Sequence, residues 1–326
     1  MQPILAVTLP FFALVLMGYV AAHRRLLPES AIPGLNAFVL YFALPAMLFR
    51  FGINTPIGQL LNPVVLAVSL LASLGIVALT IAVTLSPRVP MKDAAFGALV
   101  AAFPNTGFMG VPLLTTLLGA AAAGPVICAM LTDLFVTSSL CIALAQAQEA
   151  RGEGARAALG RALKGALSNP LPWAIASGAL CSVLGWRWLG SGSPLATIVN
   201  MLADAATPVA LFTIGAVLWR GGQHAHTRTP AALYLPVAAI KLFAHPVLVF
   251  ALAALAHALG ASIGRFEVMV LTLAAALPSA SNVSLLAERY GADNGRIARI
   301  ILSSTALGFA TFSLAAWWFE VGGASR

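Results

Sequence analysis

The chain has 326 residues, of which 60% are hydrophobic and 9% are charged, and its mean hydropathy is +0.94. A soluble domain has about 45–50% apolar and about 25% charged residues, so this composition excludes a soluble domain and indicates a polytopic membrane protein. The net charge of +8 does not indicate a nucleic-acid partner, because the basic residues lie in short segments between apolar stretches, as loop charges do. The three cysteines, Cys128, Cys141 and Cys181, lie in apolar runs without metal-ligand spacing and are expected to pack as small hydrophobic side chains.

Ten apolar segments of about 20 residues, the length that crosses a bilayer, predict an all-α membrane protein with ten transmembrane helices. The segments are residues 3–22, 32–52, 62–86, 93–117, 122–146, 169–189, 194–219, 230–256, 266–288 and 295–319. No basic residue precedes the first segment, so we expect a retained helix there rather than a cleaved signal peptide.

The basic residues predict the orientation of these segments. With the N-terminus outside, thirteen Lys and Arg residues fall in cytoplasmic loops and four fall on the opposite side. Cytoplasmic loops of membrane proteins carry an excess of these residues. We therefore expect a multi-pass protein of the inner cell membrane with both termini on the non-cytoplasmic side. Arg296 and Arg299, at the start of the last segment, are expected to be cytoplasmic anchors.

The segments divide into two halves. Residues 1–148 are expected to form a first five-helix repeat, residues 149–168 a short basic cytoplasmic loop, and residues 169–326 a second five-helix repeat. An odd number of helices in each half forces the halves into opposite orientations, which is the inverted-repeat arrangement of many secondary transporters. Local sequence supports the repeat, because Asn36 and Asn200 are each followed eight or nine residues later by a proline and then by an apolar run that ends Leu-Phe.

Polar, proline-broken stretches interrupt the fourth and ninth segments at matching positions in the two halves. The first is Phe103–Pro112 and the second is Leu277–Asn282. A proline removes a backbone N–H and frees the carbonyl one turn back. In lipid such a break is tolerated only where protein or a water-filled cavity covers it. Paired breaks of this kind indicate the binding site of a secondary transporter.

The motif in the fourth segment resembles that of the auxin efflux carrier family, whose bacterial members are often described as malate or malonate permeases. The family pattern Asn-Thr/Tyr-Gly-Phe-x-Gly-x-Pro-Leu is matched from Asn105 to Leu113, and the ninth-helix pattern Pro-x-Ala-x-Asn-x-x-x-Leu-Ala from Pro278 to Ala287. The resemblance implies a fold like that of the bile acid:sodium symporters, in which helices 4 and 9 are broken and cross near the membrane centre. Plant members have a long cytoplasmic loop that this chain lacks, so auxin as a substrate does not carry over. The oligomeric state stays open, and the plant relatives favour a homodimer.

Two broken, crossing helices would leave helix ends near the bilayer midplane. The N-terminal ends, expected near Gly107 and near Ser281 or Asn282, carry unpaired N–H groups that favour an anion such as a carboxylate, whereas the freed carbonyls favour a cation or water. The expected substrate-binding residues are those of the two breaks: Pro104, Asn105, Thr106, Gly107, Pro278, Ser281 and Asn282. Helix capping is the alternative for the two asparagines, and a hydroxyl bond to the residue's own helix backbone is the alternative for Thr106 and Ser281.

Ionisable residues inside the segments cost about 2.5–3.5 kcal/mol at a helix centre on insertion scales and therefore require a reason. Lys241 lies deep in the eighth segment and is expected to bind a substrate carboxylate or to serve ion coupling. Asp133 and Asp204 are candidates to accept a proton or coordinate sodium, and a structural pair with Lys241 or a helix cap is the alternative. His245 shares the helix face of Lys241 and could join a proton relay or pack as a hydrogen-bonded histidine. The coupling ion stays open between H⁺ and Na⁺, and no other cofactor is expected.

These features predict a secondary active transporter, not an enzyme, that moves small organic anions such as malate or malonate by alternating access. The alternatives are an ion-coupled exporter of other small organic acids or amino-acid-like solutes, and a channel, which would need a continuous polar pore. The sequence has no P-loop, His-Glu-x-x-His or Gly-x-Ser-x-Gly motif, and its aspartates lack the context of an intramembrane protease. The expected partners are the anion and the lipid bilayer.

Overall fold

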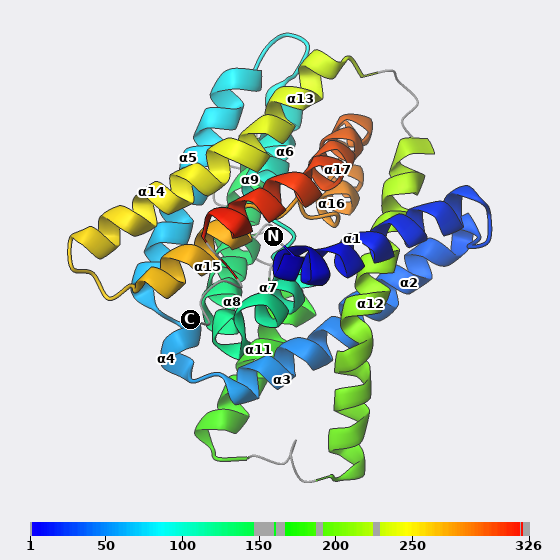
Figure 1. Cartoon of the computed structure of the whole chain (residues 1–326). Helices are drawn as coiled ribbons and strands as arrows, with labels where there is room; N and C mark the ends of the chain where they lie inside the picture. Colours follow the sequence, from blue (N-terminus) through cyan, green and yellow to red (C-terminus); the bar gives the residue numbers. More distant parts are fainter. Residues whose placement is uncertain are drawn as a thin grey trace.

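The computed structural model of this chain describes residues 2–146, 160, 167–186, 192–223, 229–319 and 321. Within these residues every element longer than an isolated β-bridge is a helix (Figure 1). The prediction of an all-α protein is therefore confirmed. Most of the expected basic loop, residues 149–168, lies outside the described residues.

The helices of the first half are α1 (Gln2–His23), α2 (Ile32–Phe38), α3 (Leu44–Asn54), α4 (Ile57–Leu60), α5 (Pro63–Thr84), α6 (Met91–Ala102), α7 (Val111–Leu118), α8 (Ala123–Thr132) and α9 (Ser138–Gln146). The helices of the second half are α11 (Pro170–Val183), α12 (Pro194–Gln223), α13 (Ala231–Ala239), α14 (His245–Ala258), α15 (Arg265–Ala275), α16 (Val283–Arg289) and α17 (Asn294–Trp318).

Seven helical stretches among the described residues are long and apolar enough to cross a membrane. They correspond to seven of the ten expected segments. The other three are residues 93–117, 169–189 and 266–288. The first and the third are divided by breaks into α6 with α7 and into α15 with α16. The second is helical over the 14 residues of α11, and residues 187–191 lie outside the description.

Three of the long stretches contain a π-helical turn. Val39–Ala43 joins α2 to α3, Asp133–Thr137 joins α8 to α9, and Ile240–Ala244 joins α13 to α14. Such turns are rare and occur frequently at functional sites. Two of them contain ionisable residues of the expected site, Asp133 and Lys241.

Glycines allow two pairs of helices to approach closely. A Cβ atom on Gly215 of α12 would collide with the Val15 carbonyl of α1, and one on Gly178 of α11 would collide with the Phe49 carbonyl of α3. Small residues at such contacts are typical of membrane helix pairs. Helices α1, α2, α3, α11 and α12, which we call the panel helices, pack chiefly on one another and occupy the right and lower part of Figure 1.

The helices that lead into the two breaks lie inside the second group, which we call the core helices (α5 to α9 and α13 to α17). Every residue from Ala94 to Ala102 of α6 is buried, as is every residue from Val270 to Ala275 of α15. Both breaks therefore lie where surrounding protein can satisfy their polar backbone groups, as an apolar membrane interior requires.

Candidate functional site

The two helix breaks contact each other directly. The Asn105 N–H donates to the Pro278 carbonyl at 2.9 Å, and the Ala280 N–H donates to the Phe103 carbonyl at 3.0 Å. Pro104 and Ser279 form the antiparallel bridge between them. Segments more than 170 residues apart in sequence thus satisfy part of each other's backbone, and we call this contact the crossing.

The crossing leaves polar groups without partners. Among the described residues, nothing accepts from the backbone N–H groups of Gly107, Phe108, Ser281 or Asn282. The Thr106 hydroxyl and the Asn282 side-chain oxygen are buried without a hydrogen bond. Buried unpaired polar groups are costly, so this concentration of them makes the crossing the candidate binding site.

The expected alternatives at the crossing are not observed. Neither Asn105 nor Asn282 caps the helix that follows it. The hydroxyl of Thr106 makes no bond to its own backbone, and the structure gives Ser281 no hydroxyl hydrogen bond. The helical turn after the first break begins at Thr106, one residue before the expected Gly107, and α16 begins at Val283, one residue after Asn282.

Two adjoining cavities lead away from the crossing. The inner cavity, of about 180 Å³, is bordered by Phe103 and Phe108 of the first break and by Asn282 of the second. The outer cavity, of about 530 Å³, shares Asn36, Leu40 and Leu285 with it. The remaining residues of the inner cavity include Leu134, Ser138, Ile142, Asn169, Leu286, Arg289 and Tyr290. Panel residues form one wall of the outer cavity and α16 forms the other.

Arg289 lines the inner cavity, although it is one of the thirteen basic residues expected in cytoplasmic loops. The available signal was its spacing, because Arg289 follows Asn282 by seven residues, two helical turns, and therefore lies on the same face of α16. Asn169 was missed as well, and no sequence pattern connects it to this cavity.

Lys241 lies on the other side of the crossing and is fully buried. Its Nζ donates to the carbonyl of Ala275, the last residue of α15, at 2.7 Å, and lies 3.1 Å from Nδ1 of His245. The cation that the freed carbonyls were expected to attract is thus supplied by the protein itself. Lys241 does not line either of the two cavities described above.

Asp133 lies close enough to Lys241 for the two charges to interact. Its Oδ1 accepts from the hydroxyls of Ser73 and Thr137, both at 3.2 Å. A cavity of about 20 Å³, room for about one water molecule, lies beside Asp133, His245 and Pro104. The structure therefore brings together three of the four ionisable residues that the sequence singled out.

Asp204, the fourth, lies elsewhere. Its carboxylate forms an ion pair with Arg50 at 2.6 Å between α12 and α3, and its side chain is 69% exposed. It contacts neither Lys241 nor the crossing.

The expectation that Arg296 is a surface anchor is wrong. Its side chain is 1% exposed. Its Nε donates to the Leu233 carbonyl and its Nη1 to the Asp93 carbonyl, both at 2.8 Å. A Cβ atom on Gly97 would lie 2.8 Å from Nη1. The arginine therefore ties α6, α13 and α17 together inside the core helices.

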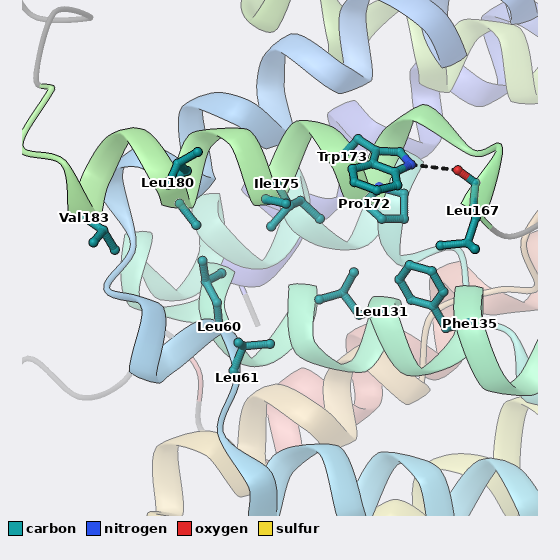
Figure 2. A pocket seen from close by; sticks show the side chains of 12 residues that line it. Leu60, Leu61, Leu131, Phe135, Leu167, Pro172, Trp173, Ile175, Leu180 and Val183 are labelled. Carbon is teal, nitrogen blue, oxygen red and sulfur yellow. Dashed lines mark hydrogen bonds between the residues drawn. The ribbon is translucent and has the colours of Figure 1, made fainter.

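A larger apolar cavity, of about 640 Å³, lies between α11 and the region of α4 and α8 (Figure 2). Its lining side chains are apolar apart from the Trp173 indole N–H, which donates to the Leu167 carbonyl at 2.7 Å. None of the expected site residues lines it. Because its described lining offers no free polar group, this cavity does not suit a small anion.

Known proteins resemble this chain over nearly its whole length. The family described as "Membrane transport protein" matches residues 3–318. A "Putative malonate transporter" of Rhizobium meliloti is 32% identical over 315 residues, which cover 95% of this chain and 94% of the relative. An "Uncharacterized transporter" of Methanothermobacter thermautotrophicus is 25% identical over 308 residues, 94% of this chain and 95% of the relative. The "Uncharacterized transporter YfdV" of Escherichia coli K12 is 25% identical over 309 residues, 92% of each chain.

The helices long enough to cross a membrane, the buried polar crossing and these relatives define a multi-pass membrane transporter. The chain belongs to the membrane transport protein family, and its resemblance to the auxin efflux carriers is confirmed.

Proposed function

We propose that this protein is a secondary active transporter of small carboxylates, with malonate as the first candidate substrate. The observation that carries the proposal is the set of unpartnered donors at the crossing, two of which, the N–H groups of Phe108 and Asn282, belong to residues that line the inner cavity. Unpaired N–H groups at a helix start favour an anion. The cavity volume of about 180 Å³ is below the range of about 300–1,000 Å³ typical of drug-sized ligands and suits a small solute. The printed name of the Rhizobium relative agrees with this substrate class.

Transport would proceed by alternating access between two inverted five-helix repeats, residues 1–148 and 169–326. The packing supports such a repeat. In an inverted repeat, each contact between two helices has a counterpart between the matching helices of the other half. The contact of α1 with α12 has its counterpart in the contact of α11 with α3, and both pairs depend on a glycine at the contact. The α5–α6 and α14–α15 contacts correspond in the same way.

The outer cavity would open to the cytoplasm. It is lined by Arg220 and Gly221 near the end of α12 and by Glu288 of α16. The distribution of basic residues favours the cytoplasmic side of an inner membrane for these helix ends, with both termini opposite. The structure would then represent an inward-facing state in which a solute can reach the crossing from the cytoplasm.

Proton coupling is favoured over sodium coupling by the surroundings of Lys241. Its ammonium already occupies the Ala275 carbonyl, which is the type of oxygen that a sodium ion would need. Asp133, His245 and the water-sized cavity beside them provide titratable groups within one buried site. A proton exchanged at Asp133 would change the charge next to Lys241. It would thereby change the strength of the hydrogen bond from Lys241 to the Ala275 carbonyl, which lies next to the second break.

Counterflow in proteoliposomes tests the function. Vesicles loaded with unlabelled malonate should take up external radiolabelled malonate with saturable kinetics. The Asn105→Ala variant should lower the rate at subsaturating malonate by about tenfold or more, the size expected when one hydrogen bond to a charged group is lost. Asn200→Ala is the matched control, because Asn200 lies within α12 and belongs to neither break.

Two results would contradict the proposal in different ways. If folded wild-type protein exchanges no carboxylate, the substrate class is wrong. If Asn105→Ala exchanges malonate as the wild type does, Asn105 does not bind the substrate.

A further inference from the structure

The inner cavity has one charged side chain. Among the described residues that line it, Arg289 alone carries a formal charge, while the others are apolar, aromatic, hydroxyl or amide side chains. An arginine at a helix C-terminus is stabilised by the helix dipole alone, so its position in the helix does not by itself indicate a ligand. The indication of a ligand comes instead from the position of Arg289 in the wall of a cavity that begins at the crossing.

Two hydrogen-bond donors that suit a carboxylate lie at separated positions in the cavity. One is at the crossing, where the backbone N–H of Asn282 has no acceptor among the described residues. The other is Arg289, which lies two turns along α16, a rise of about 10 Å between the Cα atoms. Leu285 and Leu286 line the wall between them. Because an arginine side chain spans part of this distance, the remaining gap fits a solute of a few carbon atoms.

The Arg289 guanidinium is positioned at the cavity wall by an aromatic ring. It lies 5.9 Å from the ring centroid of Tyr290, which also lines the inner cavity. No ion pair with a carboxylate is present at Arg289 in the described part of the chain. The guanidinium thus keeps its donors available for a planar, doubly bonded contact with a carboxylate.

We propose that Arg289 binds the second carboxylate of the substrate while the crossing binds the first, so that the protein selects dicarboxylates over monocarboxylates of the same length. This inference rests on the proposed function and names the substrate class of the same site. It makes Arg289 a specificity-determining residue rather than an orientation signal.

The test compares acids of equal carbon number. Counterflow is measured in proteoliposomes with labelled malonate, and malonate and propionate are each titrated as competitors for wild type, Arg289→Gln and Arg289→Lys. The Gln variant should raise the malonate KM by about 10- to 100-fold, the loss expected for hydrogen bonds between charged groups. The propionate concentration that half-inhibits exchange should stay within about twofold of the wild-type value, because a monocarboxylate makes no contact with Arg289. The malonate KM of the Lys variant should lie between those of the wild type and the Gln variant, since an ammonium keeps the charge but cannot form the bidentate pair.

Arg24→Gln is the matched control. Arg24 is exposed just beyond α1 and lines neither cavity, so this change removes the same charge without touching the site. It should leave the malonate KM and the inhibition by propionate unchanged. If Arg289→Gln leaves the malonate KM unchanged, or weakens malonate and propionate equally, the role of Arg289 in selection is overturned while the carrier function stands. If wild-type protein binds neither acid, the proposed function fails as well.

Discussion

At the scale of single residues, partners decide which polar groups are available for function. Asp133 and Asp204 were equivalent candidates in sequence. One is buried beside Lys241 and bonded by two hydroxyls, and the other is exposed and paired with Arg50. This difference separates a candidate proton carrier from a carboxylate that stabilises a contact between panel helices.

The Asp133→Asn variant keeps the shape of the side chain but cannot exchange a proton. Malonate counterflow, which needs no net proton movement, should therefore continue, whereas malonate accumulation driven by an imposed pH gradient should be lost. Both are measured as labelled malonate in proteoliposomes.

Asp204→Asn is the control for that experiment. It removes a carboxylate of the same kind from an exposed pair, and surface ion pairs contribute at most about 1 kcal/mol, so accumulation should persist. Gradient-driven accumulation that survives in Asp133→Asn would exclude this aspartate as the proton carrier.

At the scale of elements, close helix packing stabilises the panel helices, and a buried arginine stabilises the core helices. The panel helices depend on glycine at the α1–α12 and α3–α11 contacts. The core helices depend on Arg296, which bonds carbonyls of two other helices. Each device gives a prediction about stability.

Gly215→Ala should destabilise the protein. The added methyl group would meet the Val15 carbonyl, and overpacking of this kind costs about 1–3 kcal/mol. Gly222→Ala lies on the same helix with open space at the Cβ position, and replacing glycine in a helix gains up to about 1 kcal/mol. Thermal unfolding in detergent should move in opposite directions for the two variants. Equal midpoints would contradict the close contact.

Arg296→Met should lower the midpoint of thermal unfolding as well. It removes the two hydrogen bonds that the guanidinium donates to the Leu233 and Asp93 carbonyls, and a hydrogen bond to a charged group contributes about 1.5–3 kcal/mol. Arg299→Met, one turn further along α17, should cost less, because Arg299 lies over the Tyr234 ring at 6.0 Å and such a contact contributes about 0.5–1 kcal/mol. Similar losses in both variants would show that Arg296 has no special role.

At the scale of the whole molecule, the outer cavity separates panel from core. Arg220 of α12 and Glu288 of α16 lie on its opposite walls and carry opposite charges. If the substrate reaches the other side of the membrane by alternating access, this cavity must close, and its walls must meet.

Paired cysteines test that movement in protein from which the three native cysteines have been removed. Arg220→Cys with Glu288→Cys should form a disulfide under oxidation, block malonate counterflow, and recover after reduction. Ser284→Cys with Asn294→Cys is the control pair, because both side chains belong to the core helices on one side of this cavity and already lie 2.7 Å apart. Its cross-link should leave transport intact. Undiminished transport with the first pair cross-linked would contradict closure of this cavity.

The membrane class, the all-helical fold and the location of both breaks could be predicted from the residues alone. These follow from local properties: the length of an apolar run, the lost N–H of a proline, and polar residues beside it. Local properties did not predict that α11 is short, nor that three of the long helical stretches contain a π-helical turn.

The packing of the whole chain decides which residues share a site. It placed Arg289 in the inner cavity, bonded Lys241 to a carbonyl 34 residues away, and buried Arg296 against a carbonyl 203 residues away. A side chain's partners depend on the way distant helices pack, and packing depends on the shapes of all of them together. For this reason Arg296, expected at the membrane surface, is buried between helices, and Arg289, expected in a loop, lines the inner cavity.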